Sequence, residues 1–345
     1  MSAPPPLLFA LSESAALGLE ICRRSGVERA PLEERAFEEG EFKLRPLVSV
    51  RDRNVFVVQS LAGSADASAA QRLVRLLFLL FGLRDAGASK LTALIPYLAY
   101  ARKDRRTQPR DPVNTRYVAQ LLETAGLARL VCLDVHNPAA LDNSFRIPVD
   151  HLSAIPTFVR HFADHLPAAE VAVASPDVGG VKRAQIFREL LEGQLQRDVE
   201  LIFIEKRRAG GVVSGGTVVG SVSGRTVIVL DDLCASGSTL TRAAGALREA
   251  GATAVHVAFT HAPLPRGLTV LAGCADISSI VTTDSVGSMV LPKPMPAGPS
   301  VTLLHVAPLL SDAVARIVAG APLTPLLQRW PPIGDRGKRA DHKAD

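Results

Sequence analysis

The segment Leu247-Arg-Glu-Ala-Gly251-Ala-Thr-Ala-Val-His-Val-Ala-Phe259 decides the fold, because it joins the end of a helix to a buried strand. Leu83-Arg-Asp-Ala-Gly87 and Leu122-Glu-Thr-Ala-Gly126 repeat this junction and lead into the apolar runs 91–95 and 130–133. A glycine after the last helical residue suits the left-handed conformation that ends a helix. Helices alternating with short apolar strands indicate parallel sheets with helices on both faces. We therefore predict an α/β protein.

The junctions also suggest a duplication. Gly126 is followed ten residues later by His136 and then by Pro138. Gly251 is followed in the same way by His261 and Pro263. We interpret this as tandem repetition of one α/β unit. A length of 345 residues fits two domains. We place them at residues 1–150 and 151–321, followed by a polar, proline-containing tail at 322–345 that is predicted to be disordered.

Composition narrows the class of function. Aromatic residues make up only 5% of the chain, unlike a protein that stacks nucleic-acid bases. The net charge of +5 is spread over short basic runs beside turns, which favours anionic small molecules over nucleic acid. The most apolar run, 73–83, is too short to span a bilayer and is predicted to be a buried helix. Four separated cysteines exclude the usual zinc spacing and indicate reduced thiols in a cytoplasmic protein without membrane association.

The strongest functional motif is Val227-Ile-Val-Leu-Asp-Asp-Leu-Cys-Ala-Ser-Gly-Ser-Thr-Leu240. An apolar strand ends in two carboxylates, and a turn of small residues leads into a predicted helix at 240–249. Successive amides at a helix start bind phosphate, and carboxylates at the strand end suit sugar hydroxyls or a metal-bound ligand. An ordinary strand-turn-helix with a serine cap is the alternative, but it gives no reason for two aspartates to end the strand. We predict a phosphorylated substrate.

Three further strand ends carry polar groups. Tyr97-Leu-Ala-Tyr-Ala-Arg-Lys-Asp-Arg-Arg106 contains four cations, which suit a polyphosphate, although a solvated basic turn would look the same. His136 and Asp177 each follow an apolar run and together could hold Mg²⁺ on a nucleotide. A lone histidine is more often structural. The metal interpretation depends on these groups meeting at one sheet edge.

The segment Ile202-Phe-Ile-Glu-Lys-Arg-Arg208 precedes a run containing four glycines, at positions 210, 211, 215 and 216. Glycine content alone indicates flexibility. Cations at the start of such a loop favour a lid that closes over a transferring phosphoryl group. Phe37-Glu-Glu-Gly-Glu41 is predicted to be a surface turn.

Together these motifs resemble the ribose-phosphate pyrophosphokinase family. The resemblance covers roughly residues 37–286, with Tyr97 to Arg106, Asp134-Val-His136, Ser175-Pro-Asp-Val-Gly-Gly-Val-Lys-Arg183, Glu205-Lys-Arg-Arg208 and the Asp231-Asp232 loop in the family's order. It implies two tandem phosphoribosyltransferase-like domains. It also implies transfer of the β,γ-diphosphoryl group of ATP to the 1-hydroxyl of ribose 5-phosphate, which releases AMP.

The resemblance also implies roles for individual residues, including Lys206 and Arg208 as the catalytic cations and His136 with Asp177 as the holders of Mg²⁺. The implied ribose 5-phosphate site consists of Asp231, Asp232, Ala235, Ser236, Gly237, Ser238 and Thr239. The implied ATP site consists of Phe37, Glu39, Glu41, Arg102, Lys103, Asp104 and His136. The first three of these would reach adenine from a neighbouring subunit of a homo-oligomer.

The sequence departs from the family pattern at three positions. Lys103 stands where glutamine is usual, Glu39 replaces a common aspartate, and Ala235 stands where many bacterial members carry aspartate. These departures bear on how an enzyme of this family would be regulated more than on which reaction it would catalyse. Two alternatives stay open: a phosphoribosyltransferase that consumes the diphosphate product, and a non-catalytic homologue that regulates a true synthetase.

Overall fold

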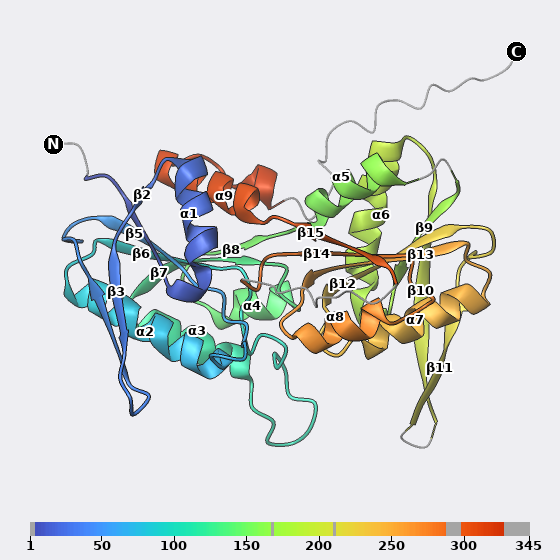
Figure 1. Ribbon diagram of the computed structural model, residues 1–345, viewed down its shortest axis with the longest axis horizontal. Helices are drawn as coiled ribbons and strands as arrows, with labels where there is room; N and C mark the ends of the chain where they lie inside the picture. Colours follow the sequence, from blue (N-terminus) through green and yellow to red (C-terminus); the bar gives the residue numbers. More distant parts are fainter. Residues whose placement is uncertain (1–3, 167–168, 210–211, 288–297, 328–345) are drawn as a thin grey trace, which may run out of the picture.

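A computed structural model of the chain describes residues 4–166, 169–209, 212–287 and 298–327, and for residues 205–209, 212–216 and 265 it describes the backbone alone. The expected α/β fold with two mostly parallel sheets is confirmed. Figure 1 shows the two sheets side by side, with helices above and below both. The last residues of the tail prediction, 328–345, lie outside the described residues.

The first sheet has the strand order β2-β1-β5-β6-β7-β8, and every neighbouring pair is parallel. Its strands are β1 (Leu7–Ala10), β2 (Glu28–Arg29), β5 (Asn54–Val58), β6 (Lys90–Ile95), β7 (Leu127–Leu133) and β8 (Val149–Leu152). A separate antiparallel hairpin consists of β3 (Leu32–Ala36) and β4 (Phe42–Pro46). The helical segments are η1 (Ser12–Ser14), α1 (Ala15–Ser25), α2 (Ala69–Asp85), α3 (Asn114–Thr124) and α4 (Pro138–Ser144). The proposed domain boundary at residue 150 falls inside β8.

The second sheet has the order β11-β10-β9-β12-β13-β14-β15, and only β10 with β11 is antiparallel within it. Its strands are β9 (Val171–Ser175), β10 (Val199–Ala209), β11 (Val212–Val219), β12 (Thr226–Leu233), β13 (Ala254–His261), β14 (Ser279–Thr283) and β15 (Ser300–Leu304). The helical segments are α5 (Ile155–His165), η2 (Val178–Gly180), α6 (Val181–Leu195), α7 (Ser238–Glu249), α8 (Pro265–Ala272), α9 (Ala307–Ala319) and η3 (Thr324–Leu326).

The strand orders agree with two related units, since β10-β9-β12-β13-β14-β15 corresponds to β2-β1-β5-β6-β7-β8. In this correspondence β13 matches β6, whereas β7 matches β14. The spacing that linked His136 to His261 is therefore not a match between equivalent strands. The glycine junctions themselves are confirmed, because Gly87, Gly126 and Gly251 all have positive φ.

The core follows from the alternation of side chains along the strands. Leu7 and Phe9 of β1 pack toward α2 and α3, whereas Leu8 and Ala10 face α1. The cluster around Leu8 continues without a break through α5 and α6 into the second sheet, so one hydrophobic core joins both halves. Helix α9, from the end of the chain, packs against α1 of the first half (Figure 1).

Three expectations are corrected or refined. The predicted glycine-rich loop is largely a hairpin, because the β-branched residues of β11 pair with β10. The predicted disorder does not begin at residue 322, since Leu323 is buried and η3 follows it. The buried helix at 73–83 is confirmed as part of α2, although Phe78 on its outer side is 58% exposed.

In the part of the chain that is described, no helix is both long and apolar enough to cross a bilayer.

Candidate active site

The predicted strand, small-residue turn and helix are confirmed at β12 and α7. Residues 226–230 of β12 are buried, and Asp231 and Asp232 follow them at the carboxyl end. Gly237 has φ of 78°, and a Cβ there would lie 2.8 Å from the carbonyl oxygen of Gly267 at the start of α8. The turn therefore needs glycine at this position. Helix α7 begins at Ser238, two residues before the predicted start.

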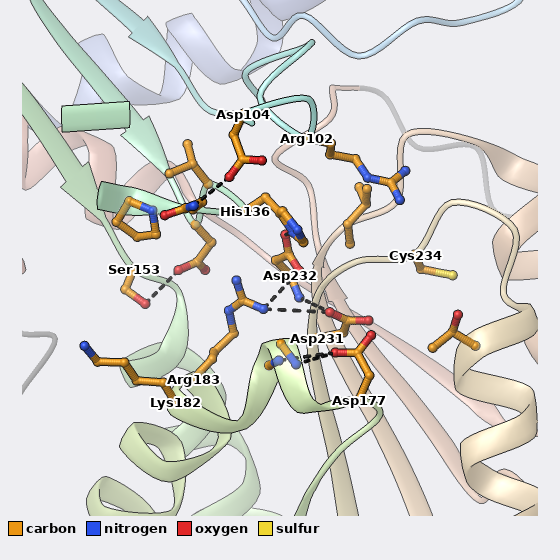
Figure 2. A pocket seen from close by; sticks show the side chains of 18 of the residues that line it. Arg102, Asp104, His136, Ser153, Asp177, Lys182, Arg183, Asp231, Asp232 and Cys234 are labelled. Atoms are coloured by element: carbon orange, nitrogen blue, oxygen red, sulfur yellow. Dashed lines mark hydrogen bonds and ion pairs between the residues drawn. The ribbon is translucent and has the colours of Figure 1, made fainter. Parts of the chain in front are cut away.

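A cavity of about 710 Å³ lies at this edge of the sheet, between the two halves of the chain (Figure 2). The predicted site residues that line it come from both halves and are Arg102, Asp104, His136, Asp177, Asp231, Asp232, Ala235, Ser236, Gly237 and Thr239. Residues far apart in the sequence meet here because the parallel strands of each sheet present their carboxyl ends on one edge of that sheet, and residues from both edges line the cavity.

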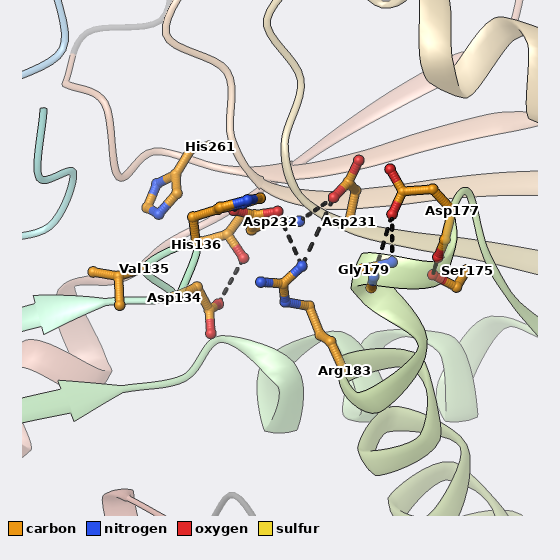
Figure 3. A network of polar contacts seen from close by, with 12 residues as sticks. Asp134, Val135, His136, Ser175, Asp177, Gly179, Arg183, Asp231, Asp232 and His261 are labelled. Atoms are coloured by element: carbon orange, nitrogen blue, oxygen red, sulfur yellow. Dashed lines mark hydrogen bonds and ion pairs between the residues drawn. The ribbon is translucent and has the colours of Figure 1, made fainter. Parts of the chain in front are cut away.

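An acidic pair forms the centre of the cavity wall (Figure 3). The Arg183 guanidinium, from the first turn of α6, donates a hydrogen bond to Asp232 Oδ1 at 2.9 Å and lies 3.7 Å from Asp231 Oδ1. His136 Nδ1, from the first half, lies 3.0 Å from Asp232 Oδ2. Asp232 is thus held by one cation from its own domain and one imidazole from the other. Sequence reasoning missed Arg183, although its position just after Gly179 and Gly180 at a helix start was a usable signal.

The pair is electrostatically asymmetric. Burial, followed by the neighbouring charge of Asp232, raises the pKa of Asp231 to about 8. Burial also acts to raise the pKa of Asp232, but the hydrogen bond from His136 and the charge of Arg183 outweigh it and hold that pKa well below its ordinary value. The same hydrogen bond raises the pKa of His136. The cavity therefore favours a charged Asp232 beside a protonatable Asp231.

The 102–111 segment contributes Arg102 and Asp104 to the cavity. Asp104 Oδ2 accepts a hydrogen bond of 2.6 Å from Asn137, the residue that caps α4. The Lys103 ammonium is turned to Asp111, with which it forms an ion pair, and to Thr107. Lys103 is not among the residues that line the cavity. Asn137 and Asp111 were not predicted, because their roles depend on contacts across the loop.

The remaining predicted residues lie elsewhere or are described in part. The predicted surface turn is confirmed between β3 and β4, where the Phe37 amide donates to Glu41 O at 2.8 Å and Glu39 is exposed. Neither that turn nor Ser238 lines the cavity. Lys206 and Arg208 stand on the part of β10 that extends beyond its pairing with β9, with a register shift between them.

The donor set around the cavity suits Mg²⁺ only with help from a ligand. Within residues 4–327, apart from the gaps given above, no three His, Cys, Asp or Glu side chains form a metal site. Mg²⁺ commonly takes one or two protein ligands and completes its shell with phosphate oxygens and water. His136 has its Nδ1 against a carboxylate, an arrangement common for histidines that bind a metal through the other nitrogen.

Comparison with known proteins agrees with this geometry. A family model for the N-terminal domain of ribose phosphate pyrophosphokinase matches residues 7–126, and a phosphoribosyl transferase domain model matches residues 155–292. A ribose-phosphate pyrophosphokinase of Listeria ivanovii is 32% identical over 94% of this chain and 98% of its own. The chain belongs to the ribose-phosphate pyrophosphokinase family.

Other relatives of this pyrophosphokinase family agree. Ribose-phosphate pyrophosphokinase 1 of Streptococcus pyogenes serotype M3 is 33% identical over 93% of this chain and 97% of its own. The crystal structure of phosphoribosylpyrophosphate synthetase from Mycobacterium smegmatis superposes with a TM-score of 0.80 and 31% identity, over 92% of this chain and all of that one. The family and the fold expected from the motifs are thus confirmed.

Proposed function

We propose that this chain transfers the β,γ-diphosphoryl group of ATP to the 1-hydroxyl of ribose 5-phosphate, giving phosphoribosyl pyrophosphate and AMP. The observation that carries the proposal is the composite cavity, with a sugar-phosphate loop from the second half and Arg102, Asp104 and His136 from the first. A transfer between two anionic substrates needs two adjacent subsites of this kind.

In the proposed reaction the ribose O1 forms a bond to the β-phosphorus. The bond from that phosphorus to the oxygen bridging the α-phosphate breaks, AMP keeps the oxygen, and the hydroxyl proton is released. Amides at residues 236–239 and the start of α7 would hold the 5-phosphate, and Asp231 and Asp232 would orient the ribose hydroxyls. Lys206 and Arg208 would neutralise charge on the transferring group.

Mg²⁺ would be held by His136 and Asp177 together with the nucleotide, and it supplies charge neutralisation at the phosphates when bound. The carboxylate of Asp177 is oriented by the amides of Gly179 and Gly180, at 3.0 and 3.3 Å. His136 is oriented by Asp232. These fixed side chains support a nucleotide-metal site that needs little rearrangement.

We further propose a cytoplasmic homo-oligomer with ATP bound at a subunit interface, near Phe37, Glu39 and Glu41. Support comes from exposed apolar side chains beside the β3–β4 hairpin, where the rings of Phe42 and the exposed Phe78 are 5.3 Å apart. Light scattering of the purified chain tests this: a Phe78→Asp variant should shift toward smaller species, and a wild-type monomer contradicts it. Fractionation of cells with tagged protein tests the compartment.

The reaction is tested by measuring AMP from ATP, Mg²⁺ and ribose 5-phosphate. Lys206→Ala and Arg208→Ala should each lower kcat by about 100-fold or more, whereas Lys90→Ala, at the amino end of β6, should leave it unchanged. Pyrophosphate release from phosphoribosyl pyrophosphate and an added base would instead indicate a phosphoribosyltransferase. No turnover by the pure chain, with stable binding to an active homologue, would indicate a regulatory protein.

A further inference from the structure

Asp134 is a buried carboxylate that the proposed reaction does not use. It follows the last residue of β7, two positions before His136, and is 5% exposed. Its φ is +36°, in a region where a side chain with a Cβ costs conformational energy. A strained residue persists only where its surroundings over-determine it, and such residues gather at functional sites.

Three hydrogen bonds hold the Asp134 carboxylate. Ser153 Oγ donates to Oδ1 at 2.8 Å, while the Ala154 amide and Thr260 Oγ1 donate to Oδ2 at 2.9 and 2.6 Å. Ser153 and Ala154 follow β8 of the first sheet, whereas Thr260 belongs to β13 of the second. One carboxylate thus joins the two halves of the molecule beside the cavity.

The neighbouring backbone is fixed in the same way. His261 of the second half donates from Nε2 to the Leu133 carbonyl at 3.0 Å. The Val135 amide donates to His151 Nε2 at 2.8 Å. Leu133, Asp134 and Val135 are thus each hydrogen-bonded to β13 or to the segment 151–154, which lie outside β7. The next residue, His136, reaches Asp232 (Figure 3).

We propose that Asp134 is a positioning residue that sets His136 against Asp232 across the domain boundary. Its three hydrogen bonds maintain the left-handed turn at the end of β7, and this turn directs the next residues toward the second half. The inference rests on the proposed function for the role of His136, but the placement itself stands on the contacts above.

Thr260→Val is the mildest test, because valine keeps the shape of threonine and removes one donor to Asp134. Thr282→Val is the matched control, since Thr282 is equally buried on the adjacent strand β14 and its hydroxyl has no partner among the described residues. We expect Thr260→Val to lower kcat/KM for ATP about five-fold. The control should retain wild-type values.

A double-mutant cycle separates positioning from a general structural effect. If Asp134 acts through His136, Thr260→Val should lower activity less than about two-fold in a His136→Ala background. Equal losses in both backgrounds overturn the proposal. Asp134→Asn, which tolerates the left-handed turn and retains one carbonyl oxygen, should keep about half of the activity, and Asp134→Ala should not.

Hydrogen–deuterium exchange provides a readout independent of activity. Thr260→Val should raise exchange of the Val135 and His136 amides several-fold, whereas Thr282→Val should not. Unchanged exchange in both variants contradicts the proposal. Absence of AMP with the wild-type chain would overturn the proposed reaction alone, because the exchange measurement still decides the role of Asp134.

Discussion

Asp231 and Asp232 are adjacent in sequence, yet their surroundings give them opposite ionisation. Asp232 has the Arg183 guanidinium and the His136 ring as partners, and its carboxylate is charged at neutral pH. Asp231 lies 3.7 Å from the same guanidinium and accepts a hydrogen bond of 2.9 Å from the backbone amide of Asp232. The proposed sugar-phosphate site would therefore offer the ribose hydroxyls one charged and one protonatable carboxyl group.

The raised pKa of Asp231 makes stability depend on pH. Its uncharged form is favoured in the folded chain, so its contribution is full below the ordinary value near 3.8 and is lost as pH rises toward about 8. Asp231→Asn should therefore raise the free energy of unfolding relative to wild type, and this difference should grow by about 1.4 kcal/mol or more between pH 4 and pH 8.

Denaturant unfolding at both pH values measures this difference. Asp232→Asn is the contrast, because a lowered pKa contributes stability at every pH above its ordinary range. That variant should be less stable than wild type at pH 5 and at pH 8 alike. A difference for Asp231→Asn that does not change with pH would contradict the asymmetric pair.

Lys103 and Arg102 are neighbours with different surroundings, and this leads to a second prediction. Lys103 is engaged by Asp111 and Thr107, whereas Arg102 lines the cavity. Lys103→Gln should therefore change KM for ATP by less than about three-fold, and Arg102→Gln should raise it by about ten-fold or more. Steady-state kinetics at saturating ribose 5-phosphate distinguishes the two. A larger effect for Lys103 than for Arg102 would mean that the loop opens on binding.

At the scale of elements, sequence reasoning succeeded where the signal was local. The glycine after each helix, the apolar strands and the carboxylates at the end of β12 depend on a few consecutive residues. Arg183 and His136 reach Asp232 over 49 and 96 positions, and no periodicity indicates such distances. The segment that forms β11 is predicted as a loop from the sequence, because its glycines are visible locally, whereas its pairing with β10 is not.

The turn between β12 and α7 is fixed by packing against α8. Gly237→Ala places a Cβ in a left-handed residue and within 2.8 Å of the Gly267 carbonyl, with Val270 Cγ1 at 3.1 Å. We expect KM for ribose 5-phosphate to rise about ten-fold, because the amides that we propose to bind the phosphate must shift. The control is Gly224→Ala, which has the same φ of 78° but no atom within 4 Å of the added Cβ.

Kinetics and thermal melts of both glycine variants separate the two effects of alanine. Strain from the positive φ alone should lower stability similarly in each, by about 1 kcal/mol. Only Gly237→Ala should affect ribose 5-phosphate. Equal KM values for the two variants would show that the turn adapts without cost to binding.

At the scale of the whole molecule, the two halves share one core. The cluster that includes Leu8 and Val131 of the first sheet also includes Val173 and Ile228 of the second. Helix α9 extends this continuity, because Leu310 from the end of the chain is fully buried in the same cluster. A helix's own sequence shows an apolar face but not the partner that will cover it, so the placement of α9 on α1 was beyond prediction.

A shared core predicts a single cooperative unfolding transition rather than one for each domain. Leu310→Ala removes buried contacts from this core and should lower the free energy of unfolding by about 2–4 kcal/mol. Val318→Ala, on the same helix but 47% exposed, should change it by less than about 0.5 kcal/mol. Scanning calorimetry checks both. Two separate transitions, of which Leu310→Ala shifts only one, would show that the halves unfold independently. The cavity between the halves would then depend on a weaker interface than the packing indicates.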